Sequence, residues 1–218
     1  MNIGTKGFTF MLLASAMVLA GSLSAVGIAG TPGAAVSTSN QGSKVTIEGT
    51  ATIYGNWSCT GEADVKAVAG KSLDPVPGFP GGVQTTTVVV SVRAIDCGDG
   101  TMNKHLRNAL KEKDFPEVRF QTEQYRLEAN GNEVKAAGDL TIAGVKKPVE
   151  IAAKLTPIAQ GGVQAVGKVD IRMRDYNVKP PTLLFGTLKV ANEISVKFDT
   201  AIKPTGETQQ AAASVQSQ

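Results

Sequence analysis

Apolar and polar residues alternate along most of the chain between residues 44 and 203. Alternation with period two is typical of a strand that is buried on one face and solvated on the other. Segment 83–95 is instead β-branched almost throughout, which also favours a strand over a helix. We therefore predict at least seven short strands. The alternating positions are Val45, Ile47, Ala51 and Ile53; Val118, Phe120 and Thr122; Leu140 and Ile142; Val149, Ile151, Ala153 and Leu155; Val163, Ala165, Val169, Ile171 and Met173; and Ile194, Val196, Phe198 and Ile202.

Turn signals separate these runs. Asn130-Gly131 lies between two alternating segments and strongly indicates a hairpin. Residues 144–148 and Gly161-Gly162 predict further tight turns. Segment 70–82 contains three prolines and four glycines, so we expect a surface loop between two strands.

One segment departs from the strand pattern and predicts an amphipathic helix over residues 102–113. Its apolar positions, spaced four apart, are Met102, Leu106 and Leu110. Asp99 or Thr101 is expected to cap the N-terminus, and Phe115-Pro116 to end the helix. Many short strands with one helix indicate an all-β fold, either an antiparallel barrel or a sandwich.

Residues 1–30 have the layout of a secretory signal peptide. Lys6 precedes an uncharged run from residue 8 to residue 26, and small residues follow it. The alternative is an uncleaved membrane anchor, because residues 8–30 are long enough to span a bilayer. We expect residues 31–43 to be a flexible lead-in and residues 204–218 a disordered tail. Residues 44–203 then form one domain of a periplasmic or secreted protein.

Charge and cysteine content narrow the class of protein further. The chain has 22 Lys and Arg residues against 19 Asp and Glu, which is too balanced for a nucleic-acid partner. It has two cysteines, Cys59 and Cys97. In an exported protein a lone pair is best explained by one disulfide, worth roughly 4 kcal/mol in the chain-entropy model. The alternative is two buried free thiols.

Little in the sequence could serve catalysis or metal binding. His105 is the only histidine, and neither a Gly-x-Ser-x-Gly elbow nor a phosphate-binding glycine loop is present. We therefore predict no catalytic residue, no metal and no cofactor. His105 is expected to form a hydrogen bond where the helix meets the sheet, and a catalytic or ligand-contacting role is the alternative. A closed sheet rich in aliphatic residues can enclose an apolar ligand or be filled by its own side chains.

Three strings resemble the YceI family: LRNALKEKDFPEVRFQT, GDLTIAGVKKPVEIAAKL and VKPPTLLFGTLKVANEISVKFD. Residues 104–106 match the family's Lys/Glu-His-Leu helix, and residues 115–120 its Tyr/Phe-Pro-x-Ile/Val-x-Phe strand. Residues 138–149 match the family hairpin Gly-x-Leu-Thr-Ile-x-Gly-Val-x-Lys-Pro-Val almost completely. The resemblance covers about residues 44–202. The front end, EGTATIYGNWSCTGEADV, departs from the commonest family pattern, and the cysteine pair is an addition.

The resemblance implies a lipocalin-like antiparallel barrel of about eight strands with the helix packed near it. It also implies that a long isoprenoid or fatty chain is held in the lumen without catalysis. The expected ligand-binding residues share one parity of their strands, opposite a polar parity. They are Phe120, Leu140, Ile142, Ile151, Ile171, Val196 and Phe198.

We therefore expect an exported, non-catalytic carrier of a long apolar lipid, above all an isoprenoid, for which a membrane is only the source of ligand. One alternative is a structural or protein-interaction barrel with a packed interior. Another is an enzyme that acts on a lipid through His105.

Overall fold

The computed structural model describes residues 36–39, 42–53, 55–70, 73–76, 79–128, 131–159, 161–183 and 187–203. For residues 36–39, Glu123 and Leu183 the description covers the backbone only. The predicted signal peptide (1–30), the predicted tail (204–218) and Asn130 of the predicted hairpin lie outside these ranges. No helix within them is long and apolar enough to cross a membrane.

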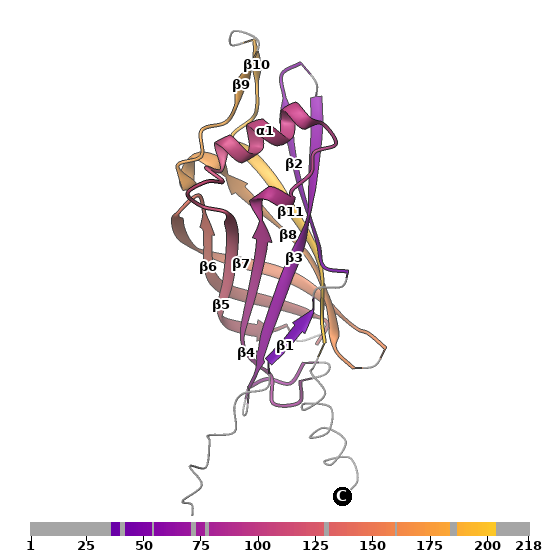
Figure 1. Ribbon diagram of the computed structural model, residues 1–218. Coiled ribbons are helices and arrows are strands. Elements are labelled where there is room, and N and C mark those ends of the chain that lie inside the picture. The colour runs from indigo at the N-terminus through magenta and orange to yellow at the C-terminus, as the bar shows by residue number, and fades with distance from the viewer. Residues whose placement is uncertain are drawn as a thin grey trace, which may run out of the picture. The chain divides into compact units, whose positions relative to one another are not determined.

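Eight antiparallel strands of the described chain close into a barrel (Figure 1). Each strand pairs with the next along the chain up to β8, β11 pairs with both β8 and β2, and the β3–β4 pairing completes the ring. This confirms the all-β, lipocalin-like barrel. The barrel strands are β2 (Lys44–Ala51), β3 (Gly55–Ala69), β4 (Val83–Ser91), β5 (Glu117–Leu127), β6 (Glu133–Ile142), β7 (Val145–Pro157), β8 (Val163–Arg172) and β11 (Glu193–Ile202).

Short elements complete the description. Strand β1 (Val36–Ser39) pairs with residues 65–68 of β3, beyond the end of β2. These four residues fall within residues 31–43, whose assignment as a flexible lead-in stays a prediction. Strands β9 (Thr182–Leu183) and β10 (Leu188–Lys189) form a separate hairpin between β8 and β11. Two 3₁₀ helices, η1 (Val92–Ala94) and η2 (Met173–Tyr176), follow β4 and β8.

Strand β3 is the longest of the described strands at 15 residues, and the alternation pattern did not predict it. Its buried positions Cys59, Gly61, Ala63, Val65 and Ala67 alternate with residues that face solvent. Small side chains at three of these five positions make the apolar face weak in the sequence. Burial comes from neighbouring strands that pack against this narrow face rather than from bulky residues on it.

The helix α1 (Gly100–Ala109) lies across one end of the barrel (Figure 1). The Asp99 side chain accepts a hydrogen bond from the Met102 amide at 2.8 Å, which confirms Asp99 as the N-cap. Thr101 lies inside the helix, so its predicted role as a cap is wrong. The helix ends earlier than predicted because Lys111 adopts the left-handed conformation, with φ of 56°.

Two loops differ from their predictions. The β6–β7 hairpin turns on Ala143-Gly144, with φ of 48° and 80°, whereas Pro148 lies within β7. Segment 70–82 is more than a surface loop, because Val76 and Phe79 are 9% and 1% exposed. Its prolines and glycines indicate a connection rich in turns. They carry no information on where its two buried apolar side chains point.

Candidate functional site

The barrel encloses a cavity of about 870 Å³, near the upper end of the roughly 300–1,000 Å³ typical of small-molecule sites. Every barrel strand contributes side chains to its wall, and α1, the β9–β10 hairpin and segment 70–82 contribute at its two ends. The wall is almost entirely apolar. The few polar side chains within it include Thr86, Thr122, Tyr125 and Thr200. Such an interior accommodates a long hydrocarbon better than a charged molecule.

All seven side chains predicted to bind a ligand line this cavity. Phe120 and Leu140 face each other across β5 and β6, and Ile171 and Ile194 across β8 and β11. The residues of the opposite parity, such as Arg119, are exposed on the outside of the barrel. The parity of the strands therefore brings the seven residues together, while their contact with a ligand remains a prediction. They are Phe120, Leu140, Ile142, Ile151, Ile171, Val196 and Phe198.

A glycine shapes the wall beside Phe198. Gly167 of β8 is paired with Phe198 of β11, and a Cβ built on Gly167 would lie 2.5 Å from Cζ of the Phe198 ring. The ring therefore lies across β8 only because Gly167 has no side chain. The alternation pattern on β8 passes through Ala165 and Val169, and it gave no sign of this contact.

The cavity reaches solvent at the α1 end, which we call the open end. Asp99 and Thr101 line it there and are exposed. Met102, His105 and Leu106 of α1 line it beside them and are half-buried. The polar lining side chains at this end include the N-cap Asp99 and, within α1, Thr101 and His105. The helix lies with its apolar stripe over the lumen, as the spacing of that stripe predicted.

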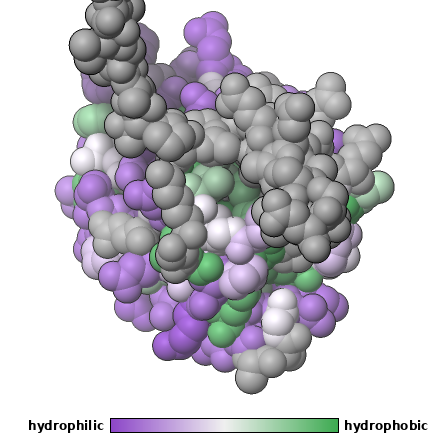
Figure 2. Space-filling view, turned by 90° about the horizontal axis from the view of Figure 1, so that it is seen from below, coloured by the Kyte–Doolittle hydropathy of each residue, from purple (hydrophilic) through white to green (hydrophobic). Residues whose placement is uncertain are grey.

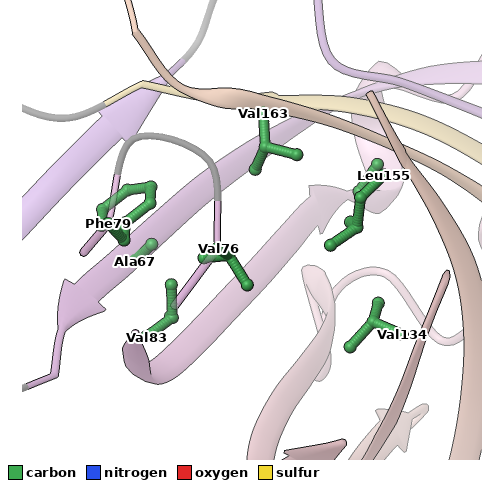
Figure 3. Close-up of a cluster of buried hydrophobic side chains, with 8 residues drawn as sticks. Ala67, Val76, Phe79, Val83, Val134, Leu155 and Val163 are labelled. Carbon is green, nitrogen blue, oxygen red and sulfur yellow. The ribbon is translucent and has the colours of Figure 1, made fainter. Parts of the chain in front are cut away.

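A group of buried side chains lies at the opposite end of the cavity, which we call the closed end, and we call this group the floor cluster (Figure 3). Its members come from β3, segment 70–82, β4, β6, β7 and β8. Seen from this end, hydrophobic residues show in the middle of a largely hydrophilic surface (Figure 2). The floor cluster consists of Ala67, Val76, Phe79, Val83, Val134, Leu155, Val163 and Ala165.

Tyr125 of β5 fastens segment 70–82 to the wall. Its hydroxyl accepts a hydrogen bond from the Val83 amide at 3.0 Å and donates one to the Asp74 carbonyl at 2.5 Å. Burial raises the pKa of the Tyr125 phenol, the Asp74 charge acts in the same direction, and the bond from Val83 opposes both. Sequence reasoning missed Tyr125, because a hydrogen bond spanning 51 positions leaves no local pattern.

A disulfide joins Cys59 of β3 to Cys97, two residues before the N-cap of α1. It confirms the predicted pairing and excludes free thiols. Paired backbone hydrogen bonds between Thr60 and Asp96, at 2.7 and 2.8 Å, run beside it. Hydrogen bonds from the Asn103 side chain and the Gly98 amide lower the pKa of Asp96. This network fixes the start of α1 to the barrel wall.

Within the described ranges there is no cluster of three or more His, Cys, Asp or Glu side chains placed to hold a metal ion. His105 lies at the rim of the cavity, where it can contact the outer end of a bound molecule. Its predicted hydrogen bond at the junction of helix and sheet stays a prediction.

Comparisons with known proteins agree with this architecture. The family model of the YceI-like domain matches residues 33–202. Protein YceI of Escherichia coli O157:H7 is 34% identical over 103 residues, which cover 42% of this chain and 51% of that protein. Protein YceI of Salmonella arizonae is 33% identical over 102 residues, which cover 42% and 50%. The chain therefore spans about half the length of the curated relatives it matches.

Two solved structures share the fold. BcnA of Burkholderia cenocepacia has a TM-score of 0.59 at 18% identity, covering 74% of this chain and 97% of that one. A domain from Saccharophagus degradans, described as a polyisoprenoid binding domain implicated in plant cell wall breakdown, has a TM-score of 0.59 at 9% identity, covering 78% and 98%. The closed barrel, its helix and the family match over residues 33–202 together show that this chain belongs to the YceI-like family.

Proposed function

We propose that this protein is a non-catalytic carrier that holds one long apolar lipid chain, above all an isoprenoid, inside its barrel. The observation that carries the proposal is the cavity of about 870 Å³ with its almost wholly apolar wall. A barrel filled by its own side chains would not leave such a space, so the cavity favours the carrier over a packed interaction module. The polyisoprenoid binding described for the Saccharophagus domain of the same fold is consistent with this choice.

Burial of hydrocarbon supplies the binding free energy in this proposal. Each CH₂ group removed from water contributes about 0.8 kcal/mol before the entropic cost of ordering the chain. Affinity should therefore increase with chain length and depend little on ionic strength. The tail enters first and any head group stays at the open end, because that is where the wall meets solvent near Asp99, Thr101 and His105.

We place the working protein in the periplasm or outside the cell. The Cys59–Cys97 disulfide supports this location, because structural disulfides persist in oxidising compartments. The layout of residues 1–30 supports it independently. Immunoblotting of cell fractions for the full-length chain and for the chain shortened by cleavage of the predicted signal peptide would test the location. A chain of full length confined to the cytoplasm would refute it.

Titration with an isoprenoid alcohol tests the binding function. Trp57 is the only tryptophan of the chain and lines the cavity, so its fluorescence reports on occupancy. Saturable binding of geranylgeraniol is expected for the wild type. Ile151→Asp should abolish it by placing a charge in the lumen, whereas Ala152→Asp should leave it intact because Ala152 is exposed outside the barrel.

Circular dichroism would establish that both variants remain folded before their affinities are compared. If both bind as well as the wild type, the ligand does not occupy the lumen. If the wild type itself shows no saturable binding with any apolar chain, the carrier function is wrong.

A further inference from the structure

We propose that the floor cluster is a ruler that sets the longest apolar chain the protein can bury completely. This inference rests on the proposed function, since it presumes that a chain enters at the open end. It adds a residue-level determinant of ligand length. The determinant lies at the far end of the cavity from any head group.

The first argument is that the closed end has two layers. Val76 and Val83 face the cavity and are 9% and 8% exposed. Behind them lie Phe79 and Ala67, which are 1% and 0% exposed and do not reach the cavity. Figure 3 shows these four side chains gathered together, with Val163, Leu155 and Val134 spread across from them. A chain that reaches Val76 or Val83 therefore meets side chains with a second, buried layer behind them.

The second argument is that hydrogen bonds hold the floor in place. Val76 and Phe79 exchange backbone hydrogen bonds of 3.2 and 2.8 Å, which bring both side chains to the same end of the barrel. The Gly82 amide donates to the Phe79 carbonyl at 2.9 Å, and the Gly70 amide donates to the Gly82 carbonyl at 2.7 Å. The Tyr125 hydroxyl adds its bonds to β4 and Asp74. Because several hydrogen bonds hold the floor in place, a ligand chain could displace it only at a cost in free energy.

Gly82 shows how closely these parts fit. Its φ is 75°, and a side chain on it would collide with the Tyr125 hydroxyl and lie 2.6 Å from Cβ of Leu73. Both the left-handed backbone and the contact with Tyr125 require glycine here. The bend at Gly82 turns the chain from the floor directly into β4.

The third argument concerns length. The cavity-lining residues of β11 run from Ile194 to Ile202, and a strand rises about 3.4 Å per residue, so the wall extends about 27 Å along the strand. The depth along the barrel axis is smaller, because barrel strands are tilted. An extended chain longer than this depth must fold back or leave its outer end in water. Its extra carbons then add little binding free energy.

The test is a titration series of isoprenoid alcohols of increasing length: geraniol, farnesol, geranylgeraniol and solanesol. The readout is Trp57 fluorescence. For the wild type we expect affinity to increase up to a limiting length, by up to about fourfold per buried CH₂. Beyond that length it should change by less than about twofold per isoprene unit.

Three variants locate the limit. Val76→Ala combined with Phe79→Ala removes bulk from both layers of the floor and should move the limit to a longer alcohol. Ala165→Leu adds bulk to the wall at the closed end and should move it to a shorter one. Val166→Leu is the matched control for Ala165→Leu, since Val166 is the next residue of β8 but is 44% exposed and does not line the cavity. It should leave the limit unchanged.

The possible outcomes distinguish failure of this inference about ligand length from failure of the proposed carrier function. A wild type that binds none of the alcohols contradicts the carrier function itself. If the wild type binds the alcohols with a length limit but neither floor variant moves that limit, the floor cluster does not set ligand length. The carrier function would still hold. If the double variant does not fold, Ala165→Leu decides alone, and an unchanged limit in that folded variant overturns the ruler.

Discussion

The hydroxyl of Tyr125 offers the sharpest test of how the closed end is held. Tyr125→Phe removes one oxygen and leaves the ring in place. The change deletes the hydrogen bond from the Val83 amide and the bond to the Asp74 carbonyl. Val83 is 8% exposed, so its amide would be left buried without this partner, whereas Asp74 is exposed and its carbonyl can bond to water.

The magnitude follows from this asymmetry. A buried donor without a partner costs about 1–3 kcal/mol, and an exposed hydrogen bond is worth less than about 1 kcal/mol. We expect the free energy of unfolding to decrease by about 2 kcal/mol. For a domain of this size that lowers Tm by about 4–8 °C. Thermal unfolding followed by circular dichroism measures it.

Tyr176→Phe is the matched control. Tyr176 is 4% exposed, and its hydroxyl makes no hydrogen bond to the residues that the structure describes. Its loss should therefore change Tm by much less. Equal Tm values for Tyr125→Phe and the wild type would refute the reasoning that the Tyr125 hydroxyl holds the floor.

The pH dependence supplies a second readout of the same group. Burial raises the pKa of Tyr125 in the folded protein, so folding favours the neutral phenol. The resulting stability is fully present below the unfolded pKa, about 10, and is lost as the pH rises through the folded value. Wild-type stability should fall at alkaline pH. The stability of the Tyr125→Phe variant should fall less steeply with increasing pH. Part of its remaining pH dependence comes from Tyr176, whose pKa is also raised by burial.

Three further predictions concern the wall, the disulfide and the helix cap. Gly167→Ala should lower the unfolding free energy by about 1–3 kcal/mol, because the new methyl group meets the Phe198 ring. Adding Phe198→Leu should recover only part of the loss in a urea titration, since the Ala152 carbonyl is also in the way; full recovery would contradict this account. Replacing Cys59 and Cys97 by Ser should lower the unfolding free energy by about 4 kcal/mol. Wild-type protein treated with reductant should lose the same amount, and a smaller loss would show that the disulfide is not its source. By calorimetry, Asp99→Ala should lower the unfolding free energy by about 1 kcal/mol and Asp99→Ser by much less, because serine can also cap the helix. Equal losses would show that the cap hydrogen bond contributes nothing.

The parity of the strands is the part of the site that sequence reasoning could reach. Each predicted lumen residue occupies a strand whose outward positions carry charge, as with Ile151 beside Glu150 and Val196 beside Lys197. The side-chain period of two then fixes which face is inside once the sheet closes. Whether the inside is filled or hollow depends on the summed volumes of all strands. Alternation on any one strand contains no such information.

Local patterns failed where contacts join distant parts of the chain. The alternation pattern did not predict β3, because small residues such as Ala63 and Ala67 give it only a weak apolar face. Packing of neighbouring strands buries that face. Segment 70–82 has the composition of an exposed loop, although Phe79 is among the most buried side chains of the described protein. Its position depends on Tyr125, which lies on another strand. Segment 70–82 lies at the closed end, whereas β3 extends from Ala67 in the floor cluster to Cys59 beside the start of α1.

The central claim is that the lumen holds a lipid, and mass spectrometry of organic extracts from natively purified protein tests it most directly. The account predicts that the wild type releases an apolar lipid, an isoprenoid above all, in stoichiometric amount. Folded Ile151→Asp protein from the same preparation should release none. An extract from the wild type without such a lipid, combined with no saturable binding of any isoprenoid alcohol, would contradict the claim.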